Sequence, residues 1–124
     1  MTEQELKDRL KRFAVRIIKM VDSMPHSISS TAIAKQIVRS GTSPIANYRA
    51  ACVGKSKKDF LNKLKMVEEE IDETGLWLDL IMECEILPRK RVSALYEESQ
   101  ELLKIIISSI LTVQNSLNSN STSK

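Results

Sequence analysis

Aromatic residues, glycine, proline, histidine and cysteine are all scarce in this chain of 124 residues. It holds two phenylalanines, two tyrosines and one tryptophan, so its core must be built mainly from Leu, Ile, Val, Met and Ala, which suits interlocking helices. Three glycines and three prolines provide few turn-forming positions. No segment of roughly 20–50 residues repeats, which argues against a solenoid. These absences favour a few long helices.

The sequence also lacks the residue patterns that catalysis and metal binding need. Its one histidine, His26, follows Pro25 and has no evident cysteine or carboxylate partner. Glu-x-x-His pairs, glycine-rich phosphate loops and nucleophile motifs do not occur. Glu69 and Glu73 share a helix face, but two carboxylates at that spacing are typical of solvation or ion pairing. We therefore expect a protein that is not an enzyme and that has no metal and no cofactor.

Membrane and secretion signals are missing as well. No apolar run approaches the roughly 18 residues that a membrane span requires, and the acidic start of the chain does not resemble a signal peptide. Cys52 and Cys84 lie inside helical patterns without a C-x-x-C pair, so we expect both to be reduced and buried as small apolar residues. The expected location is the cytoplasm, with no membrane contact.

Apolar residues that recur at steps of three and four predict four helices. A capping box begins the first helix at Thr2, and this helix should end before Pro25. A cap at Ser29 or Ser30 should begin the second, which reaches about residue 53. Pro44 either kinks the second helix or separates two shorter ones, and the nearly continuous periodicity favours a kink.

The third helix should start from a cap at Ser56 and continue to about Glu85. The fourth is expected over residues 89–117, followed by a disordered polar tail at residues 118–124, which has nothing to bury. Four long amphipathic helices with short connections predict an all-α fold, an antiparallel up-down-up-down four-helix bundle. Residues 1–117 would form this single domain.

The third and fourth helices carry more apolar surface than one bundle can cover. At 100° per residue, the apolar residues of the fourth helix span about 240°, whereas a core-facing stripe needs little over 100°. Scattered apolar residues are normal on a surface, but a contiguous group favours self-association or a tightly bound partner. The residues expected at such an interface are Leu76, Trp77, Leu80, Leu103, Ile107 and Leu111.

Two polar groups stand out on the second and third helices. Arginines and an asparagine on one helix face glutamates on the other, which favours ion pairs that fix the packing register over direct contact with a ligand. Asn47 could also bridge backbone groups near Pro44. The expected members are Arg39, Asn47, Arg49, Glu69, Glu70 and Glu73.

A basic run surrounds the connection between these two helices, where Asp59 is the only acidic residue. Repeated positive charge suits an RNA backbone, although aromatic residues for base stacking are nearly absent and a solvated face is the simpler interpretation of any single lysine. The net charge is also uneven, +6 over residues 1–56 and −3 over residues 57–124. The candidate RNA-binding residues are Arg49, Lys55, Lys57, Lys58, Lys63 and Lys65.

The stretch from Ile37 to Leu80 holds the ordered pattern RSGTS, ANYRAA, EEE, ET and WL. It resembles the four helix bundle proteins, also called 23S rRNA intervening-sequence proteins, which are encoded within insertions in bacterial ribosomal RNA genes and at other loci. A distant branch comprises accessory variability proteins of diversity-generating retroelements, which bind a reverse transcriptase and nucleic acid. The resemblance implies a homopentamer and suggests contact with structured RNA. The alternative is a module that docks a partner enzyme such as a reverse transcriptase.

Overall fold

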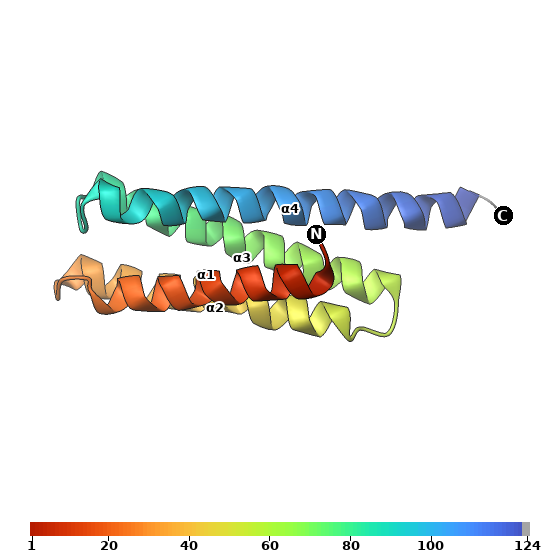
Figure 1. Cartoon of the computed structure of the whole chain (residues 1–124), viewed down its shortest axis with the longest axis horizontal. Coiled ribbons are helices and arrows are strands. Elements are labelled where there is room, and N and C mark those ends of the chain that lie inside the picture. The colour runs from red at the N-terminus through yellow and green to blue at the C-terminus, as the bar shows by residue number, and fades with distance from the viewer. Residues whose placement is uncertain (123–124) are drawn as a thin grey trace.

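The chain folds into four long helices that pack as an all-α bundle (Figure 1). The structure is a computed structural model that describes residues 1–122, with side chains described for residues 1–119. Within this part of the chain there is no strand. Figure 1 shows the chain passing back and forth between the two ends of the bundle. The helices are α1 (Glu3–Asp22), α2 (Ile28–Cys52), α3 (Lys57–Glu83) and α4 (Arg89–Thr122).

Serine and threonine hydroxyls begin the first three helices. Thr2 caps α1 by accepting a hydrogen bond from the amide of Glu5, and Ser56 caps α3 by accepting one from the amide of Asp59. Both caps were predicted from the sequence and are confirmed. The cap expected at Ser29 or Ser30 is wrong, because Ser27 has the extended backbone of a cap and accepts from the amide of Ser30.

The second helix continues through its proline. Pro44 is buried within α2, so the sequence between Ile28 and Cys52 forms one helix rather than two. Proline removes one backbone hydrogen bond and crowds the preceding turn, and the kink near Pro44 stays a prediction. The Oγ1 of Thr42 donates to the carbonyl of Val38 at 2.6 Å, in the turn before the proline.

The ends of α3 and α4 differ from the prediction. Glu83 is the last residue of α3, and Glu85 takes a positive φ of 54°, a left-handed conformation that turns the chain toward α4. Cys84 is therefore an exposed C-cap and Cys52 is only half-buried, so the expectation of two buried cysteines is wrong. Helix α4 continues to Thr122, which places a helix over most of the expected tail. Residues 123–124 lie outside the described part of the chain.

Each helix packs against two others, which leaves two diagonal pairs. Helix α1 contacts α2 and α4, whereas α3 contacts α2 and α4, and α1 shares its narrowest contact with α4. Among the described residues, no contact joins α1 to α3 or α2 to α4. The residues that fill the centre without exposed surface are Leu10, Ile17, Ile37, Leu64, Val67, Ile71, Leu78, Ile81, Val92, Leu102 and Ile106.

One close approach sets the distance between α1 and α2. A Cβ atom at Gly41 would stand 2.9 Å from both Cγ1 and Cγ2 of Ile17, which is buried. Glycine lets the two backbones approach each other where a side chain would hold them apart.

None of the helices, over their described residues, is long and apolar enough to cross a membrane.

Candidate interaction surfaces

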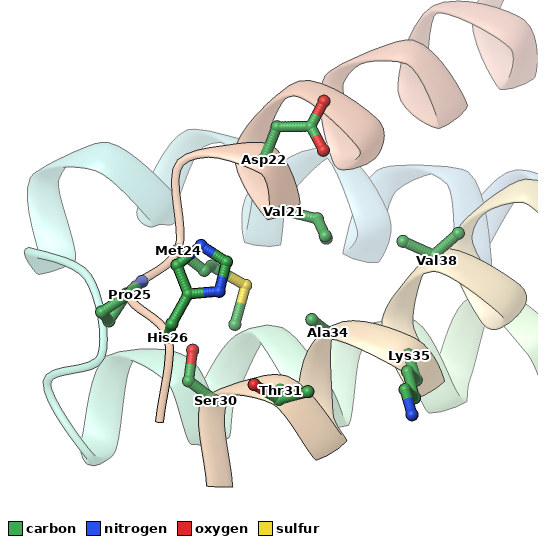
Figure 2. A pocket seen from close by; sticks show the side chains of 10 residues that line it. All are labelled: Val21, Asp22, Met24, Pro25, His26, Ser30, Thr31, Ala34, Lys35 and Val38. Carbon is green, nitrogen blue, oxygen red and sulfur yellow. The ribbon is translucent and has the colours of Figure 1, made fainter. Parts of the chain in front are cut away.

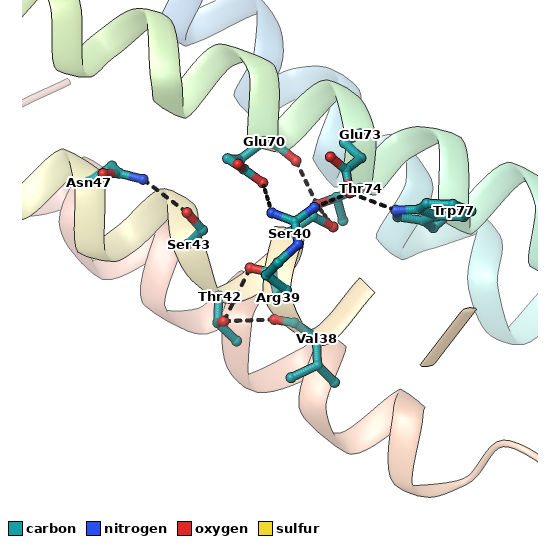
Figure 3. A network of polar contacts seen from close by, with 10 residues as sticks. All are labelled: Val38, Arg39, Ser40, Thr42, Ser43, Asn47, Glu70, Glu73, Thr74 and Trp77. Carbon is teal, nitrogen blue, oxygen red and sulfur yellow. Dashed lines mark hydrogen bonds and ion pairs between the residues drawn. The ribbon is translucent and has the colours of Figure 1, made fainter. Parts of the chain in front are cut away.

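A polar network joins the middle of α2 to α3 (Figure 3). The guanidinium of Arg39 donates to Glu70 at 2.9 Å and also to Glu73. Glu73 accepts a further bond from the indole nitrogen of Trp77 at 3.0 Å. This bond from Trp77, together with that from Arg39, lowers the pKa of the Glu73 carboxyl, although partial burial opposes the shift. The network fixes the register of two helices at their surface.

Below this ion pair lies a buried contact that the sequence did not indicate. The hydroxyls of Thr74 and Ser40 share a hydrogen bond of 2.9 Å, and both residues are fully buried. The Oγ1 of Thr74 also lies 2.8 Å from the backbone carbonyl oxygen of Glu70. Two small polar residues on facing helices therefore satisfy each other inside the core.

Three residues expected in the network lie outside it. Asn47 donates to the Oγ of Ser43 at 2.9 Å on its own helix instead of bridging the backbone near Pro44. Arg49 follows Arg39 by ten residues, which places it about 15 Å further along α2 at 1.5 Å per residue. Glu69 points away from the bundle and is exposed. The side chains of Arg49 and Glu69 form no ion pair within the described chain.

The network predicts an acid transition that tryptophan fluorescence can report. Because the folded pKa of Glu73 is lowered, its ionised form stabilises the protein above the unfolded value of about 4.3 and loses this effect as the pH falls through the folded pKa. We expect the fluorescence of Trp77, the only tryptophan, to change with a midpoint below pH 4.3 while far-UV circular dichroism remains native. Glu73→Gln should lack this transition. A midpoint at the ordinary glutamate value would contradict the assignment.

The candidate RNA-binding residues gather at the end of the bundle where α2 passes to α3. Lys55, Lys57, Lys58 and Lys65 are exposed, as is Arg49, whereas Lys63 is half-buried. None of these six side chains forms an ion pair in the part of the chain that the structure describes. The ammonium of Lys57 donates to the hydroxyl of Ser116 on α4 at 2.6 Å. We call these six residues the basic rim.

The expected interface residues are divided between exposed and half-buried positions. Leu76 on α3 is 52% exposed, and Ile107 and Leu111 on α4 are 38% and 53% exposed. The other three, Trp77, Leu80 and Leu103, are half-buried. The single chain thus leaves large apolar side chains in contact with water on two helices.

Other surface features escaped the sequence interpretation. Arg9 on α1 donates to both oxygens of Glu98 on α4 at 2.7 Å, a two-bond ion pair between residues 89 positions apart. Val15 and Ile18 on α1 are exposed large apolar residues. Their signal was present in the sequence, since both fall outside the stripe that Phe13 and its core neighbours define.

A hollow lies beside the turn between α1 and α2, where His26 is exposed at its edge (Figure 2). Its lining is mostly apolar, with Met24 and Val38 among the contributors and Asp22 at the rim. The hydroxyl of Ser30 is buried here and has no hydrogen-bond partner among the described residues. No group of three or more potential metal ligands occurs in the described chain.

Both a protein family and a solved structure are similar to this chain. A family model described as 23S rRNA-intervening sequence protein matches residues 2–108. A crystal structure from Bacteroides thetaiotaomicron VPI-5482, a protein with unknown function from the S23 ribosomal protein family, is 36% identical in sequence. The similarity covers 89% of this chain and 98% of that chain, with a TM-score of 0.82. No curated protein matches the chain.

Proposed function

The chain belongs to the 23S rRNA-intervening sequence protein family, and on this premise we propose that it is a non-enzymatic, homo-oligomeric scaffold that binds structured RNA. The basic rim is the proposed RNA-binding surface. The family resemblance implies that the assembly is a pentamer, and the proposed location is the cytoplasm. The mechanism is electrostatic docking of phosphate groups without any chemical step.

The observation that carries the proposal is the unpaired charge of the basic rim. Lys55, Lys57 and Lys58 stand close together in sequence and are exposed without a carboxylate partner in the described chain. Lys57 and Lys58 lie in the first turn of α3, where the unpaired amides of a helix N-terminus add partial positive charge. Like charges repel one another, and this repulsion is relieved when phosphates neutralise them.

Assembly would increase the affinity for RNA, because several basic rims could bind one molecule. Leu76, Ile107 and Leu111 leave apolar surface that a second copy can cover. A ring of copies presents one rim per subunit, so several weak phosphate contacts act together on one RNA. The proposed function therefore needs both self-association and the positive charge at the rim.

Filter binding of a structured RNA across a salt series tests the proposal. We expect the logarithm of the association constant to fall linearly with the logarithm of the salt concentration, because bound phosphates release counterions. The native mass, measured in parallel by light scattering, should exceed that of the 14.0 kDa monomer. An affinity that is flat with salt, or no higher than that of a charge-matched control protein, would end the RNA-binding proposal.

A second candidate function is the docking of a partner enzyme such as a reverse transcriptase. The exposed Ile107 and Leu111 favour it, because an apolar stripe on a helix suits a protein surface better than a phosphate backbone. Capture of such an enzyme should then survive nuclease treatment and moderate salt. Loss of the captured protein on nuclease treatment would point back to RNA.

A further inference from the structure

Helices α1 and α3 stand at diagonal corners of the bundle, so their outer faces point in opposite directions. Each outer face carries large apolar side chains exposed to water. Val15 and Ile18 on α1 are 41% and 43% exposed, and Leu76 on α3 is 52% exposed. Leu76 lies two residues after the buried Thr74 and two before the buried Leu78, which places it opposite the core.

The apolar residues of α1 lie among positive charges. Residues 11–19 contain four basic residues and no acidic one. Arg12 and Val15 line a shallow hollow on the outer surface of the helix, and Asp8 is the one acidic residue in its lining. None of these four cations has an ion-pair partner in the described chain. We define the α1 basic face as Lys11, Arg12, Val15, Ile18 and Lys19.

The outer face of α3 has the opposite charge. Residues 66–83 contain seven acidic residues and no basic one. Two of them, Glu70 and Glu73, are already paired with Arg39 on the side that faces α2. Of the other five carboxylates, only Glu83 forms an ion pair in the described chain, with Arg89 at 3.6 Å. We define the α3 acidic face as Glu69, Asp72, Leu76, Asp79 and Glu83.

The two faces lie at the same level along the bundle. Gly41 on α2 packs directly on Ile17 of α1, and its neighbour Ser40 bonds to Thr74 of α3. Ile17 and Thr74 therefore share one level. Ile17 lies between the exposed Val15 and Ile18, and Thr74 precedes Leu76 by half a turn. A second copy in the same orientation can set its α3 face against the α1 face without sliding along the axis.

We infer that copies of this chain associate side by side in the same orientation, with the α1 basic face of one copy packed on the α3 acidic face of the next. The inference rests on the self-association in the proposed function and names α1 and α3 as its contact surfaces. It covers Leu76, whereas Ile107 and Leu111 on α4 stay outside this contact. Burial of the central apolar residues favours association, and the surrounding charges select the partner face and its register. Because each copy offers both faces on opposite sides, the contact is heterologous and propagates until the assembly closes.

Charge reversal on each face separately tests the inference. Lys11→Glu/Lys19→Glu makes the α1 face acidic like the α3 face, and Glu69→Lys/Asp72→Lys removes the net negative charge of the α3 face. All four residues are exposed, so the fold should persist, which circular dichroism checks. Each double variant alone should associate about 100-fold more weakly than wild type in light scattering at low salt. Mixed in equal amounts, the two variants should assemble again in part, because the unchanged α1 face of one attracts the unchanged α3 face of the other and the reversed residues on the remaining two faces have opposite charges.

Matched charge changes elsewhere serve as the control. Lys55→Glu/Lys57→Glu and Glu97→Lys/Glu101→Lys change the same charges outside the two faces and should leave the assembly intact. If wild type is a monomer at micromolar concentration, the self-association of the proposed function fails. If wild type assembles but both face variants assemble equally well, the inference alone is overturned. If Lys11→Glu/Lys19→Glu assembles like wild type but binds RNA more weakly, the α1 basic face contacts RNA. That result would also overturn the inference.

Discussion

Replacing Gly41 by leucine should lower the free energy of unfolding by about 3 kcal/mol, the upper part of the range for overpacked cores. The Cβ atom alone would stand 2.9 Å from two carbons of Ile17, and the rest of the leucine has no space between α1 and α2. Ile17 is β-branched and has no exposed surface, so it cannot turn aside without disturbing its own neighbours. Urea denaturation followed by circular dichroism, at constant protein concentration, measures the change.

Gly75 provides a comparison, because it is also buried inside a long helix. A Cβ atom there would meet the Nε2 atom of Gln100, the far end of a flexible side chain that can move away. Gly75→Ala should therefore be neutral or stabilise by up to about 1 kcal/mol, the helix propensity difference. Adding Ile17→Ala to Gly41→Leu should recover part of the lost stability, because the leucine can enter the vacated volume. Wild-type stability of Gly41→Leu would show that the two helices separate without cost.

Replacing Lys55, Lys57 and Lys58 by glutamine should weaken RNA binding by about 100-fold at 0.1 M salt. Each lost phosphate contact removes roughly 0.7–0.9 from the slope of the salt dependence, so three contacts remove about 2 to 3. Both the slope and the affinity follow from one filter-binding series. The side chains are exposed, so the substitutions should leave the unfolding free energy nearly unchanged.

A second triple variant separates rim binding from general attraction by charge. Lys35→Gln/Lys90→Gln/Lys104→Gln removes three exposed lysines that do not belong to the basic rim. It should keep most of the RNA affinity and most of the salt slope. Equal losses in the two triple variants would mean that the RNA responds to net charge and that the basic rim has no special part in binding.

Helix positions in this protein follow from local chemistry, and the sequence predicts them well where that chemistry is unambiguous. The caps at Thr2 and Ser56 each have a single hydroxyl in the right place, and both form. Serine recurs at positions 27, 29 and 30, so the sequence alone did not identify Ser27 as the cap. The end of α4 was misplaced because an existing helix extends at little cost.

The polar contacts between helices also differ in how well the sequence predicts them. Arg39 with Glu70 and Glu73 could be expected because adjacent helices joined by a short turn bring these segments together. Arg9 and Glu98 belong to the first and last helices, and nothing local in either segment points to the other. Such a pairing depends on the whole bundle, so the sequence interpretation could not name it.

The ion pair between Arg9 and Glu98 also has a consequence for the order in which the protein matures. During synthesis the N-terminal helices leave the ribosome first, and the 89 positions between these residues mean that Glu98 emerges only after α3 is complete. Until then the nascent α1–α2–α3 segment lacks the fourth helix of the bundle, and the apolar side chains that later face α4 remain in water. The growing chain is therefore most exposed to unwanted association just before its last helix arrives.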